Sequence, residues 1–426
     1  MRRRAGVVLA AALLSLLGLA AGAAPADRIV IGVPTTLTLL EGAESLNAVK
    51  LAVEEINAGG GVQVGRARLP IRIEPLDLRD AETGVKVADA LATLEKFLDE
   101  KSLNAIVVGP FRSEVLLGGM DAICRRRLPL LGTIAMTPAT EALVLKNPRY
   151  KYIFRVGLDA KYLVDRLIHN MKFLREKFGF SRVFILNQDV AWARSSASLI
   201  MKLYLYKKGW NVLGQVNYPG EAADFAAGLE KAKALGAQVI LCIFDAPQSG
   251  GLVRQWRRME IPAFLSGFIS PMTGPGAWRA FDGRISGTVN VIFELGNIPS
   301  RKYPPAADFY DAYRRRFGRE IEAGHGPAPS YEAVYILAEA ITRAGSLDPD
   351  LIVAELEKTD RVGAMGRVRF HKGHQAIFGD DPQQEALACL MQWTADGRRR
   401  IVYPPSLAEG EIELPVFLQP LNRLPN

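Results

Sequence analysis

Cysteine is scarce in this sequence, occurring three times in 426 residues, and the first one is Cys124. A lipid-anchored exported protein carries a cysteine directly after its N-terminal apolar segment, so this kind of anchor is excluded. Cys242 and Cys389 lie inside apolar, strand-like segments, which favours buried free thiols. Because an exported chain meets an oxidising compartment, one disulfide between two of the three cysteines is the open alternative.

Catalytic and metal-binding patterns are also missing. The sequence contains no Gly-x-Ser-x-Gly elbow and no phosphate-binding lysine loop, and its four histidines lie apart from any nucleophile pattern. His371 and His374 share a short turn without a third ligand nearby in the sequence, which favours a surface hairpin over a metal site. We therefore expect a protein that is not an enzyme and that uses no metal and no cofactor.

The one long apolar segment lies at the N-terminus. Arg2-Arg3-Arg4 precede an apolar run from Val7 to Ala20 and the small residues Ala21-Gly22-Ala23. This order is typical of a cleaved secretory signal peptide, which we assign to residues 1–23. No later segment is apolar over the length of about 20 residues that a membrane helix needs. The sequence therefore predicts export to the periplasm without a membrane anchor.

The positive charge of the chain is modest. The full sequence has a formal net charge of +8, and three of its arginines leave with the signal peptide. The other arginine clusters, at 125–127, 314–316 and 398–400, lack interleaved aromatic residues and are typical of solvated helix ends and turns. We therefore expect no nucleic-acid partner.

From residue 28 onward, short apolar strands alternate with amphipathic helices. A first half runs from a strand at 29–33 to a strand at 128–132, and a second half opens at 152–156 and repeats the plan. Three consecutive helices follow at 305–317, 331–344 and 349–358, and the chain then returns to extended segments. The alternation predicts an α/β protein with two doubly wound parallel-sheet lobes.

Several short motifs occur in a fixed order along the chain. They are Ile31-Gly32-Val33-Pro34, the segment LAVEEINAGG at 51–60, Val107-Val108-Gly109-Pro110 with Ser113, Thr137-Pro138-Ala139-Thr140, Ile153-Phe154-Arg155 and Asp224-Phe225. Together they resemble the type I periplasmic binding proteins, specifically the leucine/isoleucine/valine-binding branch that serves ABC importers. Each motif alone is weakly specific, but the ordered set covers nearly the whole mature chain.

The resemblance implies two lobes joined by three crossovers, near Phe154, Gly287 and Gly363, with the ligand between them. Residues 24–153 and 288–363 would form the first lobe. Residues 154–287 and 364–426, including the C-terminal tail, would form the second. Open α/β sheets bind ligands at the carboxyl ends of their strands, where loops lead into helix N-termini, so the ligand residues are sought there.

The first lobe offers candidate ligand residues in three such loops. Ser113 stands at a predicted helix start, where it would hold a carboxylate, cap the helix, or do both. Ala135, Met136 and Thr137 follow the next strand and correspond to the family's second ligand loop. Glu41 aligns near a cleft-facing position in the first loop, although an exposed position ahead of the helix is the favoured alternative.

The sequence departs from the amino-acid-binding members of the family at three points. Those members carry a hydroxyl residue at Met136, a tyrosine at Trp192 and an acidic residue near Phe268, which pairs with the ammonium group of the ligand. Because a buried ammonium without a charge partner is costly, we expect a carboxylate or aromatic acid rather than a free branched-chain amino acid. Trp192, Met136, Phe244 and Phe268 would supply apolar surface, or would instead belong to the lobe cores.

The resulting prediction is a monomeric solute-binding protein that delivers a small molecule to the membrane permease of an ABC importer. Solute would bind the first lobe, and bending at the crossovers would bring Trp192 and Phe244 over it. The alternative is a ligand-sensing protein that docks on a receptor, because the same fold serves both roles.

Overall fold

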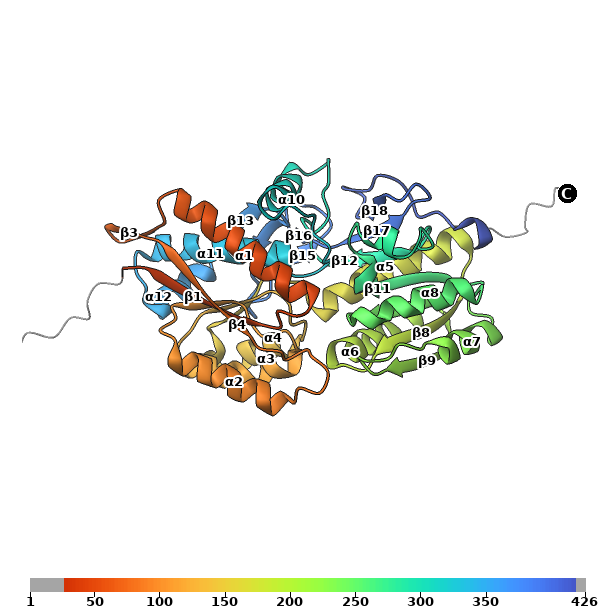
Figure 1. Ribbon diagram of the computed structural model, residues 1–426, viewed down its shortest axis with the longest axis horizontal. Helices are drawn as coiled ribbons and strands as arrows, with labels where there is room; N and C mark the ends of the chain where they lie inside the picture. The colour runs from red at the N-terminus through yellow and green to blue at the C-terminus, as the bar shows by residue number, and fades with distance from the viewer. Residues whose placement is uncertain (1–26, 419–426) are drawn as a thin grey trace, which may run out of the picture.

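The computed structural model describes residues 27–418, which form two α/β lobes arranged along the long axis of the molecule (Figure 1). The signal peptide expected over residues 1–23 lies outside the described residues. Within residues 27–418, no helix has both the length and the apolar character needed to cross a bilayer.

The first lobe is built on a five-stranded sheet with the strand order β4-β1-β5-β6-β7, in which every pairing is parallel. Its strands are β1 (Ile29–Thr35), β4 (Ile71–Asp77), β5 (Ala105–Val108), β6 (Leu130–Gly132) and β7 (Ile153–Arg155). Its helices are α1 (Leu40–Ala58), α2 (Val87–Glu100), α3 (Ser113–Arg125) and α4 (Ala139–Lys146), and a short hairpin joins β2 (Val62–Val64) to β3 (Ala67–Leu69). All four residues of β5 are buried, as expected for a central strand covered by helices on both faces.

The second lobe has a seven-stranded sheet with the order β18-β17-β12-β11-β10-β8-β9. Its strands are β8 (Arg182–Gln188), β9 (Asn211–Tyr218), β10 (Val239–Phe244), β11 (Phe264–Ile269), β12 (Val289–Ile292), β17 (Cys389–Trp393) and β18 (Arg399–Tyr403). Its helices are α5 (Ala160–Phe178), α6 (Ala191–Ile200), α7 (Ala226–Ala234), α8 (Gly250–Arg258) and α9 (Ala277–Ala280). The pairings are parallel except that β17 is antiparallel to both β12 and β18. The predicted α/β class with two parallel-sheet lobes is therefore confirmed.

A third stretch of chain returns from the second lobe to the first. It contains α10 (Pro304–Phe317), α11 (Pro327–Ala344) and α12 (Pro349–Leu356), followed by a small sheet of β13 (Asp360–Gly363), β14 (Gly366–Arg369), β16 (Ala386–Leu387) and β15 (Phe378–Gly379). Helix α11 packs along α1, so this stretch covers the first sheet as the run of helices predicted. A crossover was expected near Gly287, but β12 pairs with β11 and β17, so the chain leaves the second sheet only after Ile292. The other lobe boundaries stay predictions.

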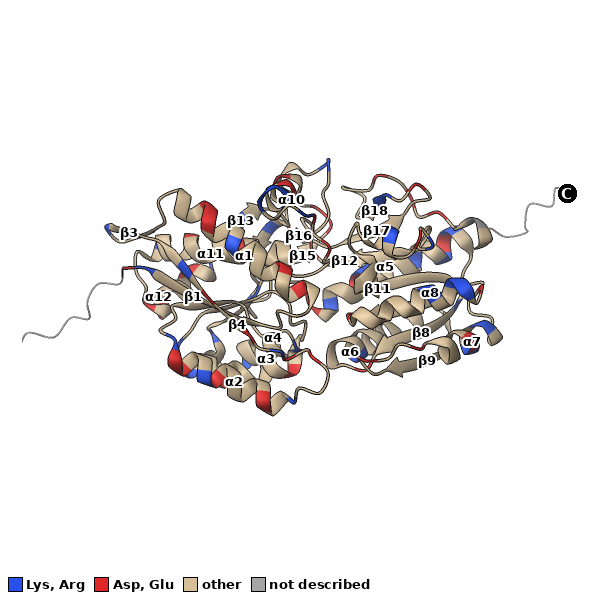
Figure 2. Cartoon of the chain, in the orientation of Figure 1, with Lys and Arg blue, Asp and Glu red and all other residues tan. Residues whose placement is uncertain are grey.

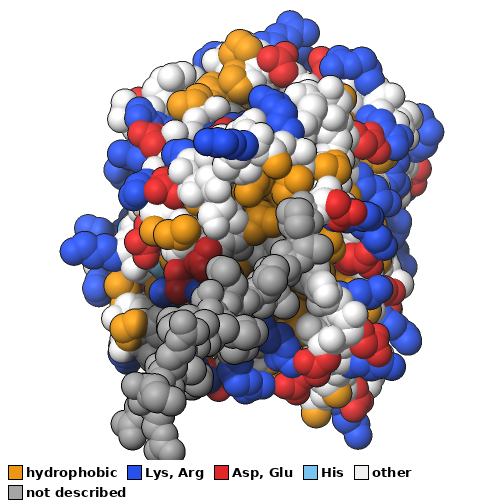
Figure 3. Space-filling model, turned by 90° about the vertical axis from the view of Figure 1, so that its left-hand side faces the viewer, with side chains coloured by type: hydrophobic (Ala, Val, Ile, Leu, Met, Phe, Trp, Pro, Cys, Tyr) orange, Lys and Arg blue, Asp and Glu red, His pale blue; other side chains and the backbone are white. Residues whose placement is uncertain are grey.

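Two large hydrophobic clusters form the interior, and the second of them lies within the second lobe around Phe184, Phe244 and Trp256. Basic and acidic residues are mixed along the chain in both lobes (Figure 2). At the end of the molecule formed by the first lobe, hydrophobic groups are likewise interspersed with charges of both signs (Figure 3). The first cluster contains residues of both lobes, so buried apolar side chains also lie at the junction of the lobes.

The three cysteines and one of the two histidines in the 371–374 turn are buried. Cys124, Cys242 and Cys389 are all buried free thiols, as the apolar context favoured, and burial raises the pKa of Cys124 and of Cys389 to about 12. The turn that contains His371 and His374 is not simply a surface hairpin. His374 is buried and stacks on Phe154, with ring centroids 4.0 Å apart, because the turn lies against β7.

Candidate functional site

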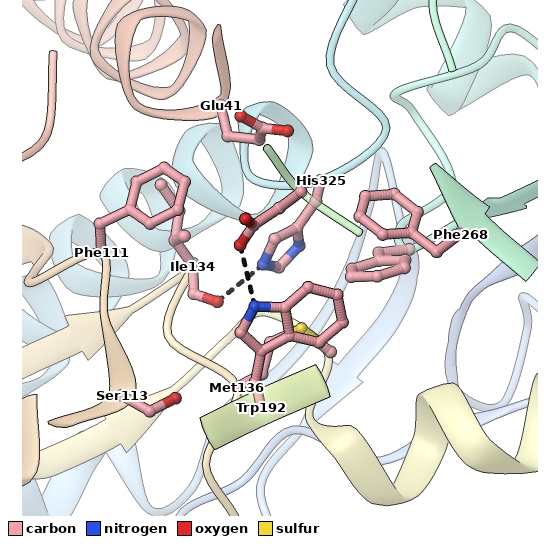
Figure 4. A pocket seen from close by; sticks show the side chains of 10 residues that line it. Glu41, Phe111, Ser113, Ile134, Met136, Trp192, Phe268 and His325 are labelled. Atoms are coloured by element: carbon pink, nitrogen blue, oxygen red, sulfur yellow. Dashed lines mark hydrogen bonds between the residues drawn. The ribbon is translucent and has the colours of Figure 1, made fainter. Parts of the chain in front are cut away.

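A pocket between the lobes is formed where strand ends and helix starts from both sheets converge (Figure 4). Its first-lobe wall comes from the start of α1, the loop between β5 and α3, the loop after β6 and the loop before α11. Its second-lobe wall comes from the start of α6, the ends of β10 and β11 and the residue after β12. The lining residues are Glu41, Phe111, Ser113, Ile134, Met136, Trp192, Asp245, Phe268, Phe293 and His325.

The space between these side chains is small. A water-sized sphere reaches a volume of only about 20 Å³ in the pocket. That is close to the minimum of roughly 10–15 Å³ that a single water molecule needs. In this arrangement of the lobes the pocket has no room for an organic molecule.

Ser113 is the first residue of α3, and its side chain is buried in the pocket wall. The residue that precedes the helix is Arg112, and no side chain caps the helix start, so the expectation that Ser113 is the capping residue is wrong. Its Oγ has no hydrogen-bond partner among the described residues. A buried hydroxyl without a partner is costly, so this oxygen is available to a ligand.

Glu41 lies in the first turn of α1 and is 3% exposed. The favoured alternative of an exposed side chain ahead of the helix is therefore wrong, because the helix begins one residue earlier and turns this carboxylate into the pocket. Ser270, from the second lobe, donates a hydrogen bond to it. Burial raises the pKa of Glu41 above its ordinary value, and the hydrogen bond from Ser270 offsets only part of that effect.

Three of the expected apolar residues meet in the pocket. The rings of Trp192 and Phe268 pack edge to face with centroids 6.0 Å apart, and Phe268 contacts Phe293 with centroids 4.1 Å apart. Met136 is 4% exposed and lies beside them. The second lobe thus presents a largely aromatic surface to the first.

The remaining expected residues do not line the pocket. Phe244 packs against Phe225 at 5.7 Å and Tyr218 at 6.4 Å in the core of the second lobe, because alternate residues of β10 face opposite sides of the sheet. Thr137 accepts a hydrogen bond from the backbone of Ala139 at 3.2 Å and so helps to begin α4. Ala135 is buried next to the pocket residue Met136 but is not part of the lining.

Five lining residues were missed by the sequence analysis, namely Phe111, Ile134, Asp245, Phe293 and His325. Asp245 directly follows β10, so the rule that ligands meet strand ends would have pointed to it. His325 had no sequence signal, because it is an isolated histidine in the loop before α11.

His325 links both lobes beneath the pocket. Its Nε2 donates to the carbonyl of Ile134 at 2.7 Å, and its Nδ1 lies 2.9 Å from Oε1 of Glu294. Burial lowers the pKa of His325, but the charge and hydrogen bond of Glu294 outweigh it and leave the pKa above its ordinary value. The imidazole thereby fixes the loop that carries Met136.

Comparison with known proteins agrees with this architecture. A family model described as "Periplasmic binding protein" matches residues 30–398. The chain is 25% identical over 418 residues to "Leu/Ile/Val-binding protein homolog 7" of Brucella melitensis, covering 94% of this chain and 98% of the relative. The chain belongs to the periplasmic binding protein family.

Solved structures share the fold at low sequence identity. A putative branched-chain amino acid ABC transporter protein from Silicibacter pomeroyi superposes with a TM-score of 0.76 at 16% identity, covering 92% of this chain and 100% of the other. The substrate-binding protein LivJ from Streptococcus pneumoniae, solved with isoleucine, gives 0.71 at 20% identity, covering 88% and 100%. The type I fold inferred from the motifs is therefore confirmed, and the family is one of solute-binding proteins rather than enzymes.

Proposed function

We propose that this chain is the exported solute-binding component of an ABC importer and that it carries a small organic acid with an apolar or aromatic body. The observation that carries the ligand class is the buried, unpartnered Oγ of Ser113 at the start of α3. The positive end of a helix dipole and an unpaired hydroxyl both favour a carboxylate. The aromatic and aliphatic side chains of the pocket would cover the rest of the solute.

The transport role is supported by the proteins that this chain resembles. Its curated relatives are named as Leu/Ile/Val-binding protein homologs, and several structural matches are described as ABC transporter substrate-binding proteins. The predicted signal peptide would place the protein in the periplasm, where it would pass its solute to a membrane permease. A monomer that opens and closes around the solute fits the nearly filled pocket.

Glu41 favours a second candidate, a free amino acid. The sequence disfavours an ammonium group because Phe268 stands near the family's acidic partner position, yet the buried Glu41 supplies a carboxylate to the same pocket. Structures similar to this one are described in complex with isoleucine and with Leu. If Glu41 is ionised it would pair with an ammonium group, and if it is protonated it would donate a hydrogen bond to an oxygen of an acid.

Matched ligand pairs separate the two candidates. Isothermal titration calorimetry would compare leucine with isocaproate, its counterpart without the amine, and phenylalanine with hydrocinnamate. We expect the amine-free acid of at least one pair to bind more tightly. Tighter binding of the amino acid in both pairs would contradict the proposed ligand class and support the second candidate.

Two variants assign the polar ends of the ligand. Ser113→Ala should weaken both members of a pair, since both carry a carboxylate. Glu41→Gln should weaken only the amino acid, because the neutral amide keeps the hydrogen bond to Ser270 but loses the charge. Figure 4 shows these two side chains on opposite sides of the pocket, so their effects should be independent.

A further inference from the structure

Arg112 does not line the pocket, yet it joins the two lobes beside it. Its Nη1 donates to Oδ2 of Asp245 at 2.6 Å, and its Nη2 donates to Oδ1 at 3.4 Å. The two side chains are 13% and 9% exposed. Because water is largely excluded, removing one partner leaves the other charge poorly solvated, so breaking this pair costs more than breaking an ion pair on the surface.

The first-lobe end of this link is held rigidly. The backbone N–H of Arg112 donates to Oδ2 of Asp80 at 2.8 Å, and Oγ1 of Thr36 donates to Oδ1 of the same carboxylate at 2.7 Å. Asp80 and Thr36 are both buried and follow the ends of β4 and β1. Arg112 therefore moves with the first lobe as one body.

The second-lobe end of the link includes a pocket residue. Oδ2 of Asp245, which receives Arg112, also accepts a hydrogen bond from Nε1 of Trp192 at 2.8 Å. Oε1 of Gln188 accepts the backbone N–H groups of Asp245 at 3.1 Å and Ala246 at 2.9 Å, which fixes the loop after β10. One carboxylate oxygen is thus shared between the arginine of the opposite lobe and the indole that faces the ligand space.

We propose that Asp245 is a positioning residue that couples closure of the lobes to the orientation of Trp192, and that Arg112 controls how long a bound solute is retained. The inference rests on the proposed function, since it takes the pocket to be the solute site. When the lobes close, Arg112 neutralises Asp245 and holds the carboxylate in place against the indole N–H. When they open, Asp245 loses its cation and Trp192 loses a fixed hydrogen-bond partner.

This arrangement predicts an effect on release rather than on capture. Solute meets the open protein, in which Arg112 and Asp245 are apart, so the pair affects the association rate constant only through the fraction of ligand-free protein that is open. Release requires the pair to separate, so the dissociation rate constant does. A residue that merely stabilised the fold would change neither rate constant in the folded protein.

The test is stopped-flow binding of hydrocinnamate and phenylalanine to the full chain and to Arg112→Gln, Asp245→Asn and the double variant. Each single variant should raise the dissociation rate constant about tenfold or more and leave the association rate constant within about twofold. The double variant should be no worse than the more affected single variant, since both remove one interaction. Arg126→Gln removes an ion pair with Asp99 on the outer face of the first lobe and should change neither rate constant.

Unchanged dissociation in Arg112→Gln, or fully additive effects in the double variant, would overturn the inference while leaving the proposed function intact. If neither probe binds the unmodified protein, the proposed ligand class fails. The coupling between Arg112 and Asp245 is then tested on the ligand-free proteins. In that case small-angle X-ray scattering of the ligand-free proteins should give a larger radius of gyration for Arg112→Gln than for the unmodified chain. Equal radii would then overturn the coupling itself.

Discussion

The two walls of the pocket are built from different chemistry. The first lobe contributes polar groups at helix starts, among them Ser113 and Glu41, each held by the backbone of its own helix. The second lobe contributes the aromatic rings of Trp192 and Phe268, and its carboxylate Asp245 is neutralised by Arg112. In the proposed function, the first lobe would fix the polar end of a solute in advance, whereas the second would form a finished surface only on closure.

The sharpest way to test the second wall is to compare two phenylalanines on neighbouring strands. Phe244→Ala should lower the free energy of unfolding by about 3–5 kcal/mol, because it empties part of the core of the second lobe. Urea denaturation measures this loss. Ligand affinity of the folded variant should be unchanged, whereas Phe268→Ala should lose affinity as well as stability.

A milder substitution covers the case in which Phe244→Ala does not fold. Phe244→Leu should cost less than about 1.5 kcal/mol and again leave the affinity unchanged. A clear loss of affinity with little loss of stability would restore Phe244 to the ligand site, which is one of the two alternatives that its sequence position leaves open.

Helix α1, which carries Glu41 in the first wall, also carries a second buried carboxylate, that of Glu44. Burial raises the pKa of Glu44, one turn after Glu41 on α1, to about 7, although the backbone N–H groups of Glu322 and Ala323 donate to it. A raised pKa in the folded state favours the protonated form. Its stabilising contribution is therefore complete below pH 4.5, the ordinary value, and is lost as the pH rises through about 7.

Glu44→Gln should therefore be more stable than the unmodified protein at pH 8, by roughly 2–3 kcal/mol, and nearly equal to it at pH 4. Denaturation curves at a series of pH values give this difference directly. A variant that is less stable at every pH would show that the ionised carboxylate, and not the protonated one, supports the loop before α11.

Ser113 is expected to separate binding from stability. Ser113→Ala should weaken binding of an organic acid by about 1.5–3 kcal/mol, the range for a hydrogen bond to a charged group. The unfolding free energy should change little, because Oγ has no partner among the described residues. Calorimetry and thermal denaturation of the same preparation give both values, and a large loss of stability would assign the hydroxyl to the fold.

Substitution of Thr137 should have the smallest effect, and it should change stability without changing binding. Thr137→Val removes the hydrogen bond to the backbone of Ala139 and should cost about 0.5–1 kcal/mol of stability. Binding should not change, since this side chain does not line the pocket. A selective loss of affinity would return Thr137 to the ligand loop.

Much of the first wall could be predicted from the sequence because its residues follow local rules. Ser113 and Met136 stand just after buried strands, and strand ends in parallel sheets converge at one edge. Phe244 was misplaced because the side of a sheet that a residue faces depends on register within the strand, and a continuously apolar strand such as β10 gives no alternation to reveal it.

The sequence by itself determined the α/β class, the two-lobed plan and the family, because hydrophobic periodicity and short ordered motifs are local properties of the chain. Only the tertiary structure decided that Glu41 is buried, that Asp245 and His325 face the pocket, and that Arg112 crosses to the other lobe. These contacts join residues that are far apart in the sequence. A local sequence pattern cannot reveal such a contact, because the way the two sheets meet decides which residues touch.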